Sequence, residues 1–378
     1  MNLNQLKRWD NLLGQVLIYL FSPLAYVVNK IIILFIEPKN SICVLKMLGG
    51  GSLLIAYPAL LGIRKKYKNN KLILICAEEV KVYALLIGIF DEIYPINTQS
   101  LLTLITSALK ALNGAFLSQF FINLEMHSKL CAIYSLCSLS KERFGLFQSW
   151  NKWQKSYINN PIFYNSHTPI YVAYDQLAIK VKAEPYEWDL AVKNFQDLNK
   201  FKPNLTNHRV AFAPFCSPLY REREFSAKEW ADIFFKFLPL GCKEIVILGG
   251  SGDIARANSI TKVLRSNFPF ICFTNKVGLT TLEQVIKEFQ VVDKLITIDS
   301  GLNHIARLLN LSIISFWGPS DPKLRLKNIN TWLENHHYHK ISCSPCVHLI
   351  DQPPCYGDNV CMKMHHNKLN PYPIWDIK

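Results

Sequence analysis

The chain has 378 residues, half of them hydrophobic, so it is long and apolar enough to bury a large core in two domains. Its formal net charge of +14 suits a protein that meets anionic lipids, phosphorylated glycolipids or nucleotide sugars. Nucleic acid is disfavoured as a partner, because the basic residues are dispersed and no nucleic-acid-binding motif is present.

Residues 1–37 are predicted to form an apolar, membrane-associated region. Leu12 to Ile36 is mostly apolar, but Pro23 and Asn29-Lys30 interrupt it, and a charge at membrane depth is costly. Lys7-Arg8 resembles the start of a signal peptide, yet no small-x-small cleavage site follows. We therefore expect two helical pieces lying on the cytoplasmic leaflet. Buried packing helices and a true transmembrane anchor are the alternatives.

Apolar runs then alternate with helix-length segments. Lys71–Cys76 and Glu244–Leu248 are continuously rather than alternately apolar, which predicts strands covered on both faces and hence parallel sheets. Another such run, Val44–Lys46, leads into a glycine loop, Gly49-Gly50-Gly51-Ser52. The glycines allow a close approach of backbone to ligand and an anion-binding nest, or simply a tight strand-to-helix turn.

The boundary between two halves of the chain is expected near residues 185–208. Residues 194–207 are polar, and a predicted strand, Arg209–Ala213, begins directly afterwards. Upstream of this boundary, Ile170–Lys182 has a helical pattern.

The most informative segment is Ile296–Ala306, an apolar run that breaks at Asp299-Ser300-Gly301 and resumes as a helix. Such a helix start offers free N–H groups and partial positive charge to a phosphate, although a helix merely capped by Asp299 or Ser300 gives the same pattern. The next predicted strand, Ser312–Trp317, ends in the loop Gly318–Pro322. Because ligands of open α/β sheets bind at the carboxyl ends of strands, both loops are expected to border one ligand site.

Eleven cysteines in a chain of this length do not imply secretion. Seven are dispersed, mostly in apolar segments, where a thiol packs as a small hydrophobe. The other four cluster near the C-terminus, at Cys343, Cys346, Cys355 and Cys361. Their spacing is compatible with a tetrahedral zinc site, with a disulfide, or with reduced packing thiols.

Four collinear segments resemble those of glycosyltransferase family nine, the lipopolysaccharide heptosyltransferase-like enzymes. They are residues 44–65 with the glycine loop, residues 213–230 with the basic loop Arg221–Ser226, the strand 245–250, and Asp299–His304 with Gly318–Pro322. The resemblance implies an α/β GT-B fold, in which two Rossmann-like domains with parallel sheets face a cleft. The expected parts are the N-terminal apolar region (1–37), an acceptor domain (38–190), a nucleotide-sugar donor domain (205–345) and a cysteine-containing tail (346–378).

The resemblance also implies an inverting reaction, in which an acceptor hydroxyl attacks the anomeric carbon of a nucleotide-diphosphate sugar. The departing diphosphate then has to be neutralised by hydrogen-bond donors and cations. These groups are expected in two loops, with Asp299, Ser300, Gly301 and His304 in one and Arg221 and Arg223 in the other. On the residues alone, His304 is equally well a packing histidine, and the arginines equally a solvated loop.

The general base is where this chain departs from the family. The usual catalytic Asp falls on Ser52, whose hydroxyl takes up no proton at neutral pH without an accessory base. Glu125 and His127, at a predicted strand end of the same domain, are the preferred substitutes, and Ser52 and Arg223 complete the expected catalytic set. The glycine loop, Gly49 to Ser52, is expected to line the acceptor. A differently activated acceptor, or binding without turnover, remains open.

The sequence therefore predicts a metal-independent glycosyltransferase that moves a sugar such as heptose. The donor is expected to resemble ADP-heptose, and the acceptor to be lipopolysaccharide or another envelope glycolipid at the cytoplasmic face of the inner membrane. No cofactor and no catalytic metal are expected, since no Asp-x-Asp pair stands at a strand end. A non-catalytic nucleotide-sugar or glycan-binding relative is the alternative that Ser52 favours. A Rossmann oxidoreductase or epimerase is disfavoured, because Gly49–Ser52 lacks the Gly-x-Gly-x-x-Gly pattern.

Overall fold

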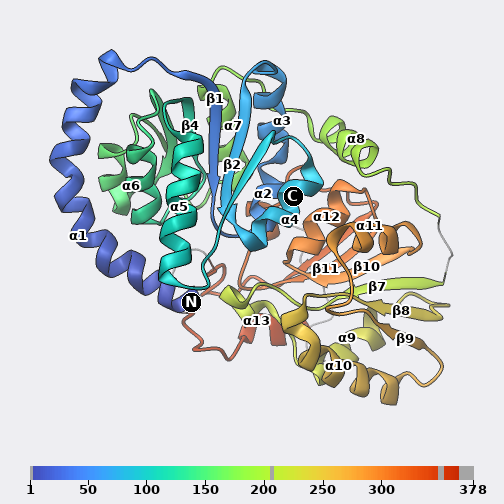
Figure 1. The fold of residues 1–378 in the computed structure, drawn as a ribbon. Helices are drawn as coiled ribbons and strands as arrows, with labels where there is room; N and C mark the ends of the chain where they lie inside the picture. The colour runs from blue at the N-terminus through green and yellow to red at the C-terminus, as the bar shows by residue number, and fades with distance from the viewer. Residues whose placement is uncertain (1–2, 205–207, 348–352, 366–378) are drawn as a thin grey trace. The chain divides into compact units, whose positions relative to one another are not determined.

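The computed structural model describes residues 3–204, 208–347 and 353–365. The chain divides into two compact units, Met1–Glu187 and Trp188–Lys378 (Figure 1). Each unit contains a six-stranded sheet whose neighbouring strands all pair in parallel, as the continuous apolar runs predict.

In the first unit the strand order is β3-β2-β1-β4-β5-β6. The strands are β1 (Lys39–Lys46), β2 (Lys71–Ala77), β3 (Glu92–Ile96), β4 (Ser118–Asn123), β5 (Glu142–Phe147) and β6 (Asn160–Phe163). One face of this sheet carries α2 (Gly50–Ile55), α3 (Tyr57–Lys66), α4 (Glu78–Ile87) and α7 (Ile170–Lys180), and the other carries α5 (Leu101–Ala115) and α6 (Lys129–Cys137) (Figure 1). A 3₁₀ helix, η2 (Ser149–Ser156), follows β5.

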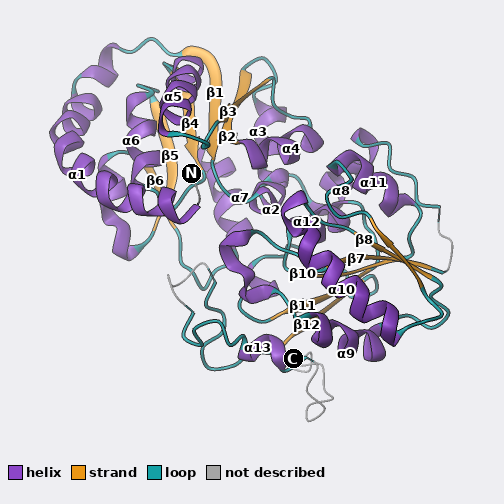
Figure 2. Cartoon of the chain, turned by 60° about the horizontal axis from the view of Figure 1, so that its bottom comes forward, coloured by secondary structure: helices purple, strands orange, loops and turns teal. Residues whose placement is uncertain are grey.

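The second unit repeats this topology, with the strand order β9-β8-β7-β10-β11-β12. Its strands are β7 (Arg209–Ala213), β8 (Glu244–Ile247), β9 (Cys272–Asn275), β10 (Lys294–Ile298), β11 (Ile313–Trp317) and β12 (Glu334–Tyr338). Its helices are α8 (Trp188–Leu198), α9 (Ala227–Phe237), α10 (Ile254–Asn267), α11 (Leu282–Gln290), α12 (Gly301–Leu308) and α13 (Val360–Lys363), and its 3₁₀ helices are η3 (Pro218–Arg223), η4 (Ser251–Asp253) and η5 (Pro322–Leu324) (Figure 2).

The strand order places a topological switch point in each sheet. It lies between β1 and β4 in the first unit and between β7 and β10 in the second, where consecutive crossovers leave in opposite directions. The carboxyl ends of two parallel strands meet at such a point, which is where ligands of doubly wound sheets bind. A ligand site is therefore expected in the loops that follow these four strands.

A helix lies within the range 185–208 where the sequence places the boundary. Residues 194–207 are polar in sequence, but residues up to Leu198 belong to α8, and residues 205–207 lie outside the described part. The helix forms because Trp188, Ala191, Val192 and Phe195 recur on one face and are buried. Polar residues on its other face give the segment its linker-like composition.

The N-terminal region is also simpler than expected. Instead of two helical pieces it forms one α-helix, α1 (Leu3–Lys30), followed by a short 3₁₀ helix, η1 (Ile32–Phe35). Pro23 lies inside α1 without ending it. Among the described residues α1 is the one helix long and apolar enough to cross a membrane, judged by length and composition alone.

Candidate active site

Two loops of the second unit emerge side by side at its switch point. Thr297 near the end of β10 pairs in register with Ala213 at the end of β7, and the Thr297 hydroxyl donates to the Ala213 carbonyl at 2.8 Å. The segment that leads to Arg223 follows β7, and the Asp299-Ser300-Gly301 turn follows β10. Sheet register alone therefore brings these two predicted loops together.

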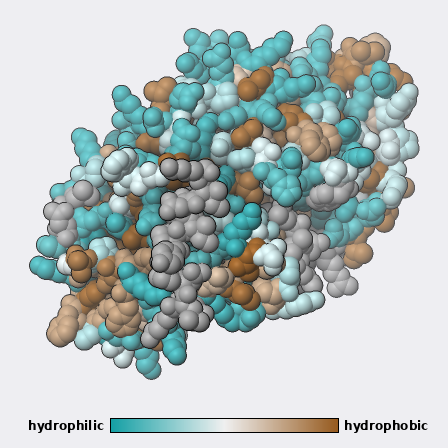
Figure 3. All heavy atoms as spheres, turned by 180° about the vertical axis from the view of Figure 1, so that it is seen from behind, coloured by the Kyte–Doolittle hydropathy of each residue, from teal (hydrophilic) through white to brown (hydrophobic). Residues whose placement is uncertain are grey.

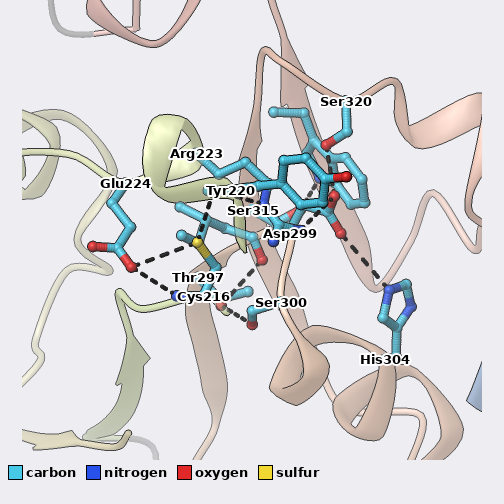
Figure 4. A network of polar contacts seen from close by, with 12 residues as sticks. Cys216, Tyr220, Arg223, Glu224, Thr297, Asp299, Ser300, His304, Ser315 and Ser320 are labelled. Atoms are coloured by element: carbon cyan, nitrogen blue, oxygen red, sulfur yellow. Dashed lines mark hydrogen bonds and ion pairs between the residues drawn. The ribbon is translucent and has the colours of Figure 1, made fainter. Parts of the chain in front are cut away.

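Asp299 lies at the centre of the resulting network (Figure 4). Its Oδ2 is 3.1 Å from Nη1 of Arg223 and accepts a hydrogen bond of 2.6 Å from the Ser320 hydroxyl. Its Oδ1 is 3.7 Å from Nε2 of His304. Ser320 lies in the loop after β11, so this single carboxylate joins the loops that follow three neighbouring strands, all of which the sequence predicted to border one ligand site.

Burial controls the charges in this network. Burial alone would raise the pKa of Asp299, but Arg223 and His304 outweigh it and hold that pKa well below its usual range. For Arg223, burial lowers the pKa, yet the Asp299 carboxylate more than compensates and the pKa is raised. Burial also lowers the pKa of His304, against the opposing pull of Asp299. At neutral pH the site therefore holds a buried ion pair beside a neutral imidazole.

The start of α12 is not closed by a side-chain cap. Ser300 occupies the N-cap position with extended backbone, but its side chain makes no capping hydrogen bond, and the Asp299 carboxylate is engaged by Arg223 and Ser320. In the first turn, Asn303 is fully buried, and neither polar atom of its amide has a partner among the described residues. Simple capping, the alternative for this motif, is therefore not what the structure contains, and unsatisfied polar groups remain at the helix start.

The basic loop holds Arg223 in a fixed position. Its Nε donates to the Tyr220 carbonyl at 3.2 Å, and the loop is tied back where Glu224 accepts from the Cys216 amide at 3.0 Å. Glu224 is also paired with Arg256 of α10. Arg221, the other predicted donor-binding arginine, is exposed, and its charge contributes to the pKa shifts of Asp253 and Arg256.

The first unit has a second polar cluster at its own switch point. Lys46, which ends β1, lies 2.6 Å from Oε1 of Glu125, which follows β4, and the same oxygen accepts from the Leu48 amide at 3.0 Å. Glu125 thus fixes the start of the glycine loop. His127, two residues farther along, is exposed.

The glycine loop is a tight turn into α2. Gly49 has φ of +81°, a backbone conformation that side chains disfavour, and its carbonyl accepts from the Ser52 hydroxyl at 2.7 Å. A Cβ on Gly50 would lie 2.0 Å from the Tyr83 ring. The geometry of the turn therefore accounts for Gly49 and Gly50. Ser52 closes the turn through its hydrogen bond to Gly49.

The four clustered cysteines line one small cavity beside Glu222 and Pro319. All four are free thiols, and Cys346 donates its amide to the Pro319 carbonyl at 2.9 Å, which ties the tail to the loop after β11. Within the described residues no three His, Cys, Asp or Glu side chains are arranged to hold a metal ion. Of the three alternatives that the sequence left open, the structure therefore contains the reduced thiols.

Three side chains of these two clusters were not among the site residues predicted from the sequence. Lys46, a cation that follows the apolar residues Ile42–Leu45 at the end of β1, was a usable signal for a buried pair. Ser320 belonged to a motif noted in the sequence but carried no assigned role. Asn303 could not be identified from the sequence, because an asparagine in a helix is usually exposed and only the structure shows that this one is buried.

Comparison with known proteins agrees with this architecture. The sequence model of Glycosyltransferase family 9 (heptosyltransferase) matches residues 162–356, just over half of the chain. Lipopolysaccharide heptosyltransferase 2 of Salmonella typhimurium is 33% identical over 79 residues, which are 21% of this chain and 22% of that protein. The matched stretch thus spans about a fifth of the length of the curated relatives.

Solved structures extend the likeness to most of the fold. The E. coli ADP-heptose lipopolysaccharide heptosyltransferase II is 15% identical with a TM-score of 0.58, over 79% of this chain and 91% of that one. The E. coli heptosyltransferase WaaC, solved with ADP, is 14% identical with a TM-score of 0.55, over 79% and 93%. The predicted GT-B fold class is confirmed by these likenesses and by the two sheets. The chain belongs to glycosyltransferase family 9, the heptosyltransferase family.

Proposed function

We propose that this protein is an inverting, metal-independent glycosyltransferase. Its donor would be a nucleotide-diphosphate sugar resembling ADP-heptose, and its acceptor lipopolysaccharide or a related envelope glycolipid at the cytoplasmic face of the inner membrane. The observation that carries the proposal is the contact of 3.1 Å between Arg223 and Asp299, which sets a buried guanidinium beside the start of α12. Family membership and the ADP held by an E. coli relative favour this donor class.

The donor diphosphate would bind between Arg223 and the first amides of α12. A guanidinium carries five N–H donors, and the pairs with Asp299 and Tyr220 engage two of its nitrogens, Nη1 and Nε. The uncapped amides at Ser300 and Gly301 add the partial positive charge of a helix start. Because these groups are fixed by the fold before the ligand arrives, they can stabilise charge that develops on the leaving diphosphate.

The acceptor hydroxyl would lose its proton to Glu125 or His127. Both observed contacts of Glu125 fall on Oε1, so we assign proton uptake to its other oxygen, Oε2. Ser52 donates its own proton to Gly49, which suits a role in shaping the loop rather than in taking up protons.

Donor turnover by purified variants tests the donor site. Arg223→Ala and Gly301→Val should each abolish turnover of an ADP-sugar, because one removes the cation and the other crowds the helix start. Lys228→Ala, an exposed cation on α9, is the control and should behave like the wild type. A chelator should leave turnover intact. Unchanged kinetics in both site variants, with folding verified by circular dichroism, would rule this site out.

A second experiment separates an enzyme from a binding relative. A donor analogue that stabilises the protein in a thermal shift assay, with no transfer to any glycolipid fraction, would favour the non-catalytic alternative. If transfer is seen, Glu125→Gln and His127→Gln identify the base. Loss of the ionisation on the acidic side of the pH–rate profile, with donor binding retained, is expected for the group that takes up the proton.

A further inference from the structure

The inner face of α1 is fastened along its length to the first unit. Gly14, Ile18, Ala25 and Val28 are buried at helical spacing, and the apolar side chains among them pack on α6 and Tyr157. A Cβ on Gly14 would lie 2.7 Å from the Lys129 side chain, so this glycine lets the two helices approach closely. Figures 1 and 2 both show α1 along the outer side of α6.

Polar anchors fix α1 at both ends. The Asp10 carboxylate accepts from the Ser128 hydroxyl at 2.7 Å and from the Leu130 amide at 2.9 Å, at the start of α6. Near the other end, Asn29 donates to the Ser156 carbonyl at 2.8 Å and accepts from Arg143. Because Arg143 is fully buried, it would lose a necessary partner if α1 left the unit to span a membrane. These anchors favour a helix that stays packed on its unit.

The outer face of α1 and its continuation is mostly apolar, and its exposed polar residues are Asn11, Gln15, Ser22 and Lys30. Eleven large hydrophobic side chains are exposed there: Leu12, Leu13, Val16, Tyr19, Leu20, Leu24, Tyr26, Val27, Ile31, Leu34 and Phe35. In Figure 3, which is turned so that α1 falls on the right-hand edge, brown apolar residues lie at the upper right among paler and hydrophilic ones. Residues 11–36 include one charged residue, Lys30, and no acidic one. An apolar patch of this size on the surface of a protein is typical of a face that contacts another protein or a lipid phase.

We infer that this outer face, defined by these eleven residues, docks on an anionic lipid bilayer with α1 lying in the plane of the headgroups. Lys30 and the net charge of +14 complement anionic headgroups, and the absence of carboxylates removes the repulsion that such lipids would otherwise exert. Tyr19 and Tyr26 combine an apolar ring with a polar tip, as side chains at a membrane interface do. A face that binds another protein usually has a polar rim around its apolar core.

The inference deepens the proposed function. It rests on that function in one respect, namely that the glycolipid acceptor lies in the same lipid surface on which α1 docks. Docking itself requires no sugar transfer. It is therefore measured on the full-length protein with vesicles alone, without donor or acceptor, so that a failure of docking and a failure of transfer are told apart.

Vesicle flotation tests the docking surface. The wild type should float with phosphatidylglycerol–phosphatidylethanolamine vesicles and much less with phosphatidylcholine vesicles. The triple variant Leu13→Gln/Val16→Gln/Leu20→Gln removes three neighbouring apolar side chains and should lower the partition coefficient roughly a hundredfold. The control Leu240→Gln/Phe270→Gln alters two highly exposed apolar residues of the second unit and should float like the wild type. Circular dichroism and melting curves verify that each variant is folded.

Several results would overturn the inference. A wild type that stays off both kinds of vesicle, or a triple variant that floats as well as the wild type, excludes this surface as a lipid contact. A wild-type dimer in sedimentation that the triple variant converts to monomer would assign the face to a second copy of the chain. Resistance of membrane-bound protein to a carbonate wash would indicate a spanning helix in place of an in-plane one.

Discussion

Replacing Asp299 by asparagine tests the central ion pair. The change keeps the shape of the side chain and removes the charge that compensates Arg223, whose guanidinium cannot lose its proton at accessible pH. Arg223 is only 8% exposed and Asp299 4%, so solvent cannot replace the missing charge. Breaking a buried pair from one side costs about 3–5 kcal/mol. For a unit of this size the melting temperature should fall by roughly 10 °C.

A double-mutant cycle measures the pair directly. Denaturant unfolding of Asp299→Asn, Arg223→Met and the double variant gives the coupling energy, and the double variant should be less destabilised than the sum of the two single changes. Lys276→Met is the matched control. It removes a partly exposed cation from its pair with Glu288, which keeps Arg209 as a partner, and should cost about 1 kcal/mol or less.

One outcome would contradict a compensating role for Asp299. If Asp299→Asn costs less than about 1 kcal/mol and the two single changes are additive, Asp299 does not compensate a buried cation. Arg223 would then not be held in place for a diphosphate by this carboxylate. A stable Asp299→Asn protein that binds ADP as tightly as the wild type would also contradict the role of Asp299 in positioning Arg223 for the diphosphate.

Two further predictions concern glycine packing and acid stability. Gly50→Ala should destabilise the first unit by about 1–3 kcal/mol in denaturant unfolding, because the new methyl group meets the Tyr83 ring, whereas Gly252→Ala, with no atom within 4 Å, should be nearly neutral. Burial against Phe316 lowers the pKa of His337 to about 4, so the folded state resists its protonation. The unfolded chain therefore binds the extra proton first, and stability should be complete above about pH 6.5 and fall by about 3 kcal/mol towards pH 4. His337→Gln should flatten this slope, and an unchanged slope would exclude His337 as its source.

The sequence was sufficient for several of the central strands and for the strand-to-helix turns that follow them. Continuous apolar runs locate β1, β2, β8 and β10, and the break at Asp299 locates the start of α12, because these signals are local. Parallel register then follows from the alternation of strands and helices. The same logic placed Glu125 at a strand end, where the structure has it directly after β4.

Contacts between residues that are distant in the sequence could not be predicted from local sequence patterns. Local sequence does not reveal that Asp299 faces Arg223 rather than the amides of α12, because both arrangements satisfy the same motif. Helix α8 was missed because its exposed face is polar enough to resemble a linker. Pro23 suggested a break in α1, but packing of α1 on α6 holds the helix through it. In each case tertiary contacts decide between local alternatives.

The two units share an arrangement that no sequence repeat indicates. In the first, Lys46 at the end of β1 pairs with Glu125 after β4, and in the second, Arg223 after β7 pairs with Asp299 after β10. Each unit therefore sets a cation from its first strand against a carboxylate from its fourth, across its switch point. Buried pairs of this kind add little net stability, since desolvation offsets their attraction. Their presence at both switch points is better explained by positioning, because each carboxylate also orders the loop beside it, through Leu48 in one unit and Ser320 in the other.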